Sequence, residues 1–167
     1  MLALRLDIHN FDYGFYVAGS NLEMNRIFLV ENRIHHNYKT DFGSSNIYMS
    51  ALMGNTFTDP RMSHNMYAYY KGKLYITNNL MERAGYGGNN DYLEYPPDWP
   101  AEFYSNKVNL RVASGLSFAG DVVIADNIVK DGGAGITVGL SNACDVVCAS
   151  DIRNKRVLIE RNTVIRE

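Results

Sequence analysis

The stretch LYITNNLM at residues 74–81 decides the fold, because close copies of it recur along the chain. The copies are IFLVENRI at 27–34, SALMGNTF at 50–57, VVIADNIV at 122–129 and VLIERNTV at 157–164. Each copy alternates apolar residues with other residues and then reaches an Asn. This pattern is typical of a short β-strand that ends in a bend.

The spacing of the repeated Asn residues indicates how the copies are arranged. The series is Asn32, Asn55, Asn79, Asn127 and Asn162. Its first two intervals are 23 and 24 residues, and the third is twice 24. Recurrence at such an interval indicates stacked turns of a coil rather than one flat sheet. We expect the Asn amides to form a ladder at one bend, each bonding the next turn. We also expect these Asn residues to adopt the left-handed backbone that a bend needs.

A second set of alternating stretches lies between the Asn copies, and no run at the helical period of 3.6 is convincing. These stretches are 13–18, 45–50, 64–69, 108–113 and 134–139. If each turn contributes one strand from each set, every strand lies over its equivalent in the next turn. We expect no polar residue at the inward positions, because one would disrupt the stack. They are Ile27/Leu29, Leu74/Ile76, Val122/Ile124 and Val157/Ile159 in the first set, and Phe15/Val17, Ile47/Met49, Met66/Ala68, Leu110/Val112 and Ile136/Val138 in the second.

With these two strand sets, the chain resembles the right-handed parallel β-helix superfamily of pectate-lyase-like proteins, which includes polysaccharide lyases. The resemblance implies an all-β, right-handed parallel β-helix of about five to six turns, either complete or a fragment of a longer β-helix. It implies a single domain over residues 1–167, with loop insertions at 85–107 and 141–154. It also implies an extracellular or cell-surface location, although residues 1–20 show no signal-peptide pattern.

Composition narrows the classes of partner. The formal net charge of −2 is spread over both signs, which argues against nucleic acid and against an anionic membrane surface. No apolar run reaches the length that would span a membrane. The two cysteines, Cys144 and Cys148, are consistent either with a local disulfide or with two free thiols. Because no capping turn is recognisable at either end, we expect end-to-end self-association or the remainder of a longer chain.

Aligning the second strand set produces two outward columns that suit a polysaccharide. One column is Tyr16, Tyr48, Tyr67, Arg111 and Thr137, and the other is Gly14, Asn46, Asn65, Asn109 and Gly135. Tyr rings offer stacking faces and Asn amides offer hydrogen bonds, a combination that a glycan requires. Trp99 and Tyr92, in the first insertion, are expected to fold over this groove. The alternative is that stacked Tyr residues merely cover a sheet face well.

Four residues are candidates for eliminative cleavage of an acidic polysaccharide. That reaction needs a cation near the uronate carboxylate, a base for the α-proton and an acid for the leaving oxygen. Arg111 could be the cation, His64 or Lys107 the base, and Tyr67 the acid. The segments SHNMYAYY and VNLRVAS resemble the His/Tyr and Lys/Arg pairing of some β-helix polysaccharide lyases. The alternative is an exposed His and an Arg that bridges neighbours.

Other chemistries have less support in the sequence. Glycoside hydrolysis needs two carboxylates facing one sugar, and no two fall together in the outward columns. We expect no cofactor and no metal site, with calcium left open for the carboxylates of the first insertion. The adjacent His35 and His36 are expected to point opposite ways at a solvated turn. The alternative function is a non-catalytic β-helix segment of a surface adhesin, phage fibre or tailspike.

Overall fold

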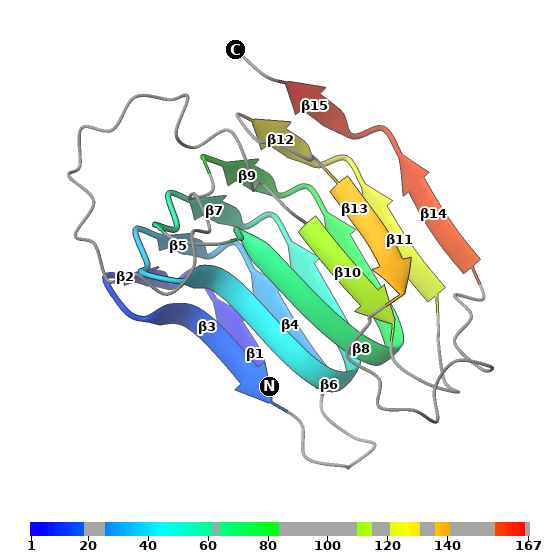
Figure 1. The fold of residues 1–167 in the computed structure, drawn as a ribbon, viewed down its shortest axis with the longest axis horizontal. Coiled ribbons are helices and arrows are strands. Elements are labelled where there is room, and N and C mark those ends of the chain that lie inside the picture. The colour runs from blue at the N-terminus through cyan, green and yellow to red at the C-terminus, as the bar shows by residue number, and fades with distance from the viewer. Residues whose placement is uncertain are drawn as a thin grey trace.

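The protein is an all-β chain of parallel strands stacked into a solenoid. The computed structural model describes residues 1–18, 26–61, 64–83, 110–114, 121–130, 136–140 and 156–165. Every strand pairing among these residues is parallel, and none of them is helical. Figure 1 shows strands from successive turns lying side by side in layers. The insertions predicted at 85–107 and 141–154 lie outside the described part of the chain.

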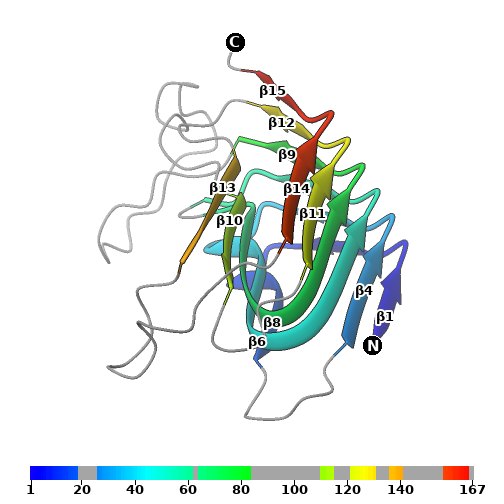
Figure 2. The same ribbon diagram turned by 90° about the vertical axis from the view of Figure 1, so that its right-hand side faces the viewer.

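Each turn contributes strands to three parallel sheets. The first sheet is formed by β1 (Leu2–Leu4), β4 (Arg26–Val30), the end of β6 (Thr40–Met53), the end of β8 (Met66–Thr77), β11 (Asp121–Ala125) and β14 (Arg156–Glu160). The second is formed by β3 (Tyr13–Ala18), the beginnings of β6 and β8, β10 (Leu110–Ser114) and β13 (Ile136–Leu140). The long strands β6 and β8 bend from one sheet into the other, as Figure 2 shows.

Each strand of the third sheet follows a strand of the first sheet, and two residues link them. It consists of β2 (Asp7–His9), β5 (Arg33–His35), β7 (Thr56–Thr58), β9 (Leu80–Glu82), β12 (Ile128–Lys130) and β15 (Thr163–Ile165). The two linking residues form what we call the Asn corner. The first of the two always has a positive φ, between 51° and 67°, at Arg5, Glu31, Gly54, Asn78, Asp126 and Arg161. The second is Leu6 and then each of the repeated Asn residues.

The predicted Asn ladder is confirmed. The backbone N–H and the Nδ2 of Asn55 both donate to Oδ1 of Asn79, at 2.9 and 3.0 Å. Asn79 donates in the same way to Oδ1 of Asn127, at 3.0 Å for both bonds. Each Nδ2 also donates back to a carbonyl of the preceding turn, as Asn79 does to Leu52 at 2.8 Å. The four ladder residues from Asn32 to Asn127 are at most 2% exposed, so the ladder satisfies polar groups that lie inside the fold.

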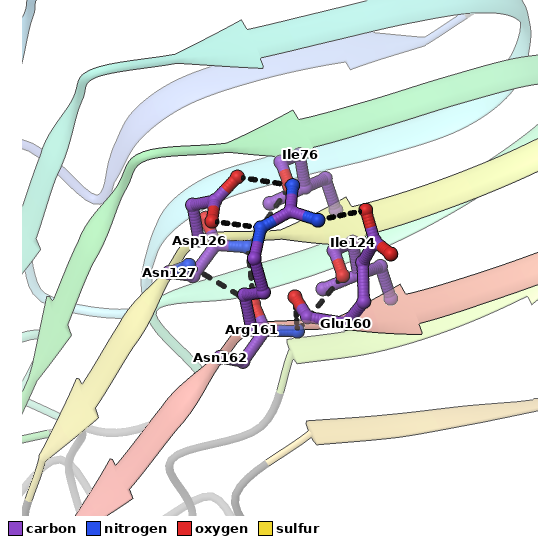
Figure 3. Close-up of polar contacts among 7 residues, drawn as sticks. All are labelled: Ile76, Ile124, Asp126, Asn127, Glu160, Arg161 and Asn162. Carbon is purple, nitrogen blue, oxygen red and sulfur yellow. Dashed lines mark hydrogen bonds and ion pairs between the residues drawn. The ribbon is translucent and has the colours of Figure 1, made fainter.

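The expectation that the ladder residues adopt the left-handed backbone is wrong. The residue before each ladder position takes that conformation and points its side chain outward. This arrangement lets charged residues of neighbouring turns pair on the outside, as Arg5 Nε does with Glu31 at 2.7 Å. Figure 3 shows the equivalent contact, in which Arg161 donates to both Asp126 oxygens at 2.7 and 2.8 Å and also to Glu160.

The predicted core is confirmed for most of the first strand set. Ile27, Leu29, Leu74, Ile76, Val122 and Ile124 are at most 1% exposed. Each buried aliphatic side chain of this size stabilises the fold by roughly 1.5–3 kcal/mol. Val157 and Ile159 occupy the same inward positions in β14 but are 42% and 49% exposed. Among the described strands, β14 has a parallel neighbour on one side only, β11.

The register expected for residues 45–50 is wrong. Strand β6 begins at Thr40, so Gly43 pairs with Tyr16 on one side and with Tyr67 on the other. Phe42 therefore takes the inward position expected for Ile47, although Ile47 is itself fully buried elsewhere on β6. Ser44 lies between Val17 and Ala68 and is 2% exposed, so the inward column does contain a polar residue.

Candidate functional site

An aromatic surface lies on the second sheet, and Tyr16 is its most exposed described ring. Tyr16 is 55% exposed and lies on β3, where its aromatic ring rests against Gly43 of β6. A Cβ atom at Gly43 would approach Tyr16 Cδ2 to 2.8 Å, closer than carbon atoms normally come. Gly43 thus leaves space for the Tyr16 ring to lie across the neighbouring strand.

Tyr13 extends this surface at the beginning of β3. Its ring centroid is 5.0 Å from that of Tyr16, with the planes tilted by 44°. The Lys39 ammonium lies 5.1 Å from the centroid of Tyr13, within the range of a cation–π contact. Lys39 Nζ is also 3.4 Å from a carboxylate oxygen of Asp12. The two charges beside the Tyr13 ring therefore offset each other.

His64 and Tyr67, two of the predicted catalytic residues, lie together. Their ring centroids are 5.0 Å apart with planes tilted by 42°, and both residues are partly buried. The pairing of β8 with β10 places Arg111 directly beside Tyr67 in the backbone. The structure therefore places Tyr67 and Arg111 of the predicted set on adjacent strands, with His64 two residues before β8. Only the backbone of Arg111 is described.

The remaining predicted residues are distributed differently. Asn65 was expected to face outward, but it is fully buried, and its Nδ2 donates to the carbonyls of Phe57 and Glu82, both at 3.0 Å. Tyr48 does not join the Tyr16–Tyr67 column, because the register places Gly43 there. The same shift of five residues removes Asn46 from the column predicted for Gly14 and Asn65. Six further predicted residues, Lys107, Asn109, Tyr92, Trp99, Cys144 and Cys148, lie outside the described residues.

A buried polar cluster beneath the aromatic surface was not anticipated from the sequence. Asp41 is fully buried, accepts a hydrogen bond from Asn37 Nδ2 at 2.9 Å and lies 3.4 Å from Asn65 Nδ2. Burial raises the pKa of the Asp41 carboxyl well above its usual range, and the hydrogen bonds from Asn37 and Asn65 only partly oppose that effect. The one signal in the sequence was the 24-residue spacing between Asp41 and Asn65, equal to the ladder period.

Replacing Asp41 with asparagine should remove one source of pH dependence in stability. Because the folded state raises the pKa of Asp41, it binds more protons than the unfolded chain above pH of about 4, the usual value for Asp. The stability that Asp41 contributes is therefore present at low pH and lost as pH rises through the folded pKa. We expect Asp41→Asn to flatten this decline in chemical unfolding measured across pH. The exposed Asp12→Asn control should keep it, and an unchanged slope in Asp41→Asn would contradict the assignment.

The comparisons with known proteins leave the family of this chain open. No protein-family model, no curated protein and no solved structure matches it. Among the described residues, no helix is long and apolar enough to cross a membrane. Within the same residues, no group of three or more His, Cys, Asp or Glu side chains is placed to hold a metal ion. The proposed function therefore rests on the side chains of the aromatic surface.

Proposed function

We propose that this chain is a right-handed parallel β-helix of about five to six turns, of the pectate-lyase-like kind, that binds an extended polysaccharide. The observation that carries the proposal is the run of aromatic side chains over β3, β6 and β8. Tyr13 and Tyr16 are 39% and 55% exposed, and Tyr67 follows two strands further along in register. Neighbouring strands are spaced by about 4.8 Å, so Tyr16 and Tyr67 are about 9.6 Å apart, with Gly43 between them, which is about the length of two sugar units.

The charges near these rings support binding through stacking rather than through a strong electrostatic field. Asp12 offsets Lys39, and Asp41 beneath the surface is held towards its neutral form by burial. Sugar rings present C–H faces that pack on aromatic side chains, and Tyr hydroxyls can bond the glycan edge. An extracellular or cell-surface location belongs to the same proposal, since long polysaccharides are found there.

Substituting Tyr16 should weaken binding without unfolding the protein. We expect Tyr16→Ala to reduce affinity for the bound glycan by about tenfold, which corresponds to about 1.4 kcal/mol of lost stacking. Affinity would be measured by calorimetry on the glycan selected from a panel of neutral and acidic polysaccharides. The matched control is Tyr75→Ala, which removes a partly buried Tyr from the first sheet. Equal losses in the two variants, or no binding to any glycan, would overturn the proposal.

Cleavage by β-elimination is a second candidate, favoured by the contact between His64 and Tyr67. In that reaction Arg111 would neutralise the uronate carboxylate, His64 or Lys107 would take the α-proton, and Tyr67 would protonate the leaving oxygen. Each cleavage produces a conjugated uronate that absorbs ultraviolet light. Incubation with alginate, pectate and glycosaminoglycans, with and without calcium, would reveal this absorbance. Binding without absorbance would instead favour a non-catalytic segment of an adhesin, phage fibre or tailspike.

A further inference from the structure

Three histidines and an aspartate gather where β2 and β5 end, at a corner that the proposed function does not use. The His9 ring stacks on His35, with centroids 5.0 Å apart and planes within 20°. His36 meets the same His35 ring edge-on, at 4.9 Å and 85°. His35 is 9% exposed, whereas His36 is exposed. The expectation that His35 and His36 point opposite ways at a solvated turn is therefore wrong.

Hydrogen bonds fix where the protons of this cluster can sit. His35 Nε2 is 2.8 Å from Asp7 Oδ1, and a carboxylate can only accept, so Nε2 carries a proton and donates it. His35 Nδ1 is 2.7 Å from His36 Nδ1. Two ring nitrogens at that distance share one proton, which one donates and the other accepts. In the neutral pair, His36 Nδ1 is the donor and His35 Nδ1 the acceptor, while His36 Nε2 is unprotonated.

We propose that Asp7, His35 and His36 form an acid-sensitive latch, which tolerates one added proton and opens when a second is added. The first proton binds at the exposed His36 Nε2 and leaves the contact between the two Nδ1 atoms intact. The second would put a proton on both Nδ1 atoms at once, so that two N–H groups and two positive rings face each other. The rings must then separate.

Partial burial and nearby charges keep the latch closed at neutral pH. Although the His36 residue is exposed as a whole, burial of part of its ring is the main cause that lowers its pKa. His35, Arg61 and Arg33 lower it further, while Asp59 opposes them. Around His35, Asp7 is an anion and the stacked His9 is a second titratable ring, itself contacted by Asn10 at 2.8 Å. Because the folded state lowers the pKa of His36, the unfolded chain binds more protons. Stability is therefore full above the usual His pKa and is lost as pH falls through the folded value.

Opening of the latch would act on the backbone that links three turns. His36 has a φ of 54°, and its N–H donates to the Thr58 carbonyl of the next turn at 3.1 Å. The following residue, Asn37, is fully buried and bonds in both directions along the stack. Its Oδ1 accepts from Phe11 N–H at 3.2 Å, and its carbonyl accepts from Arg61 N–H at 2.8 Å. Movement of His36 is thus transmitted directly to this corner.

Histidine-ring NMR and hydrogen exchange on the full chain test the proposal. At neutral pH, His36 should carry its proton on Nδ1 and His35 on Nε2. Between about pH 7 and pH 5, protection factors of the amides of His36 and Arg61, which donate to the Thr58 and Asn37 carbonyls, should fall by at least about tenfold. His36→Asn, which tolerates a positive φ and does not titrate, should abolish this pH response.

The matched control is His9→Gln, which removes a stacked ring of the same cluster but leaves the contact between His35 Nδ1 and His36 Nδ1 in place. This variant should retain most of the response. The proposal would be overturned if His35 and His36 both became cationic while the two amides stayed protected. It would also be overturned if His9→Gln and His36→Asn abolished the response equally, because a general effect of nearby charge would then account for it.

Discussion

Replacing Asn79 with alanine is expected to lower the free energy of unfolding by at least about 3 kcal/mol. The Asn79 side chain accepts two hydrogen bonds from Asn55 and donates to Leu52 and Asn127, and the residue is 1% exposed. Truncation would leave the backbone N–H of Asn55 and the Leu52 carbonyl without these partners in the interior, while Asn55 Nδ2 would keep only its bond to the Leu29 carbonyl. Each buried polar group left without a partner costs about 1–3 kcal/mol. Urea unfolding followed by circular dichroism measures the loss.

The preceding residue is the matched control, since Asn78 is also an asparagine at the same corner. Asn78 has a φ of 56° and an exposed side chain. Glycine adopts that backbone without strain, so Asn78→Gly should change stability by less than about 1 kcal/mol. Similar unfolding midpoints for Asn79→Ala and Asn78→Gly would show that the ladder contributes little to stability.

Replacing Gly14 with alanine is expected to have a comparably large effect, at least about 3 kcal/mol, for a steric reason. A Cβ atom there would lie 2.4 Å from Ile34 Cγ2, 2.5 Å from Asn37 Nδ2 and 2.7 Å from the Asp41 carbonyl oxygen. Ile34 belongs to the core, Asn37 bonds the buried Asp41, and the carbonyl is part of the β6 backbone. Because none of these neighbours can move freely, the first turn should lose its packing. Thermal unfolding measures the effect.

Gly43→Ala is the matched control for the Gly14 substitution. Its nearest obstacle is Tyr16, an exposed ring that can rotate away. We expect a stability cost below about 1 kcal/mol, together with weaker glycan binding because the Tyr16 ring no longer lies across β6. If Gly14→Ala were as stable as Gly43→Ala, the close packing around Gly14 would be refuted.

Much of the fold could be predicted because its strongest constraint is periodic. Every ladder copy repeats an alternating strand and an Asn, so the sheet positions of Ile76 or Ile124 follow from spacing alone. The left-handed residue was assigned one position too late. Residues as different as Glu31, Gly54 and Arg161 occupy that position, and no single residue type marks it. The positive φ that recurs at this position is a property of the backbone, and the residue types there do not predict it.

The predicted register of β6 was wrong for a different reason. Ile47 and Met49 alternate as an inward pair should, whereas Phe42 and Ser44 form a weaker pattern. Only the neighbouring strands decide between them, by pairing Phe42 with Phe15 and with Met66. The buried cluster of Asp41, Asn37 and Asn65 was missed for the same reason. From sequence alone, polar residues of a strand are predicted to face outward, and only the packing of neighbouring turns shows that these three are enclosed.

The candidate site was predictable only in part. His64 and Tyr67 belong to one segment and Arg111 to another, with Tyr67 and Arg111 44 positions apart, and strand pairing brings the two segments together. The space that Gly43 leaves for Tyr16 depends on a distance of a few ångströms between two turns, and the contact between His35 Nδ1 and His36 Nδ1 depends on how two adjacent rings are oriented. Sequence spacing does not contain that information.

The Asn corner also determines where this protein can gain or lose residues. From Asn32 to Asn55 the chain uses 23 residues, and from Asn79 to Asn127 it uses 48, yet both intervals end in the same two-residue corner. An extra residue at the corner would break the ladder contacts with both neighbouring turns. The connection between β9 and β10, residues 83–109, accounts for most of the added length and contains none of the ladder asparagines. We expect the protein to accept foreign peptides grafted into that connection. The solenoid could then carry different peptides there while its Asn ladder stays unchanged.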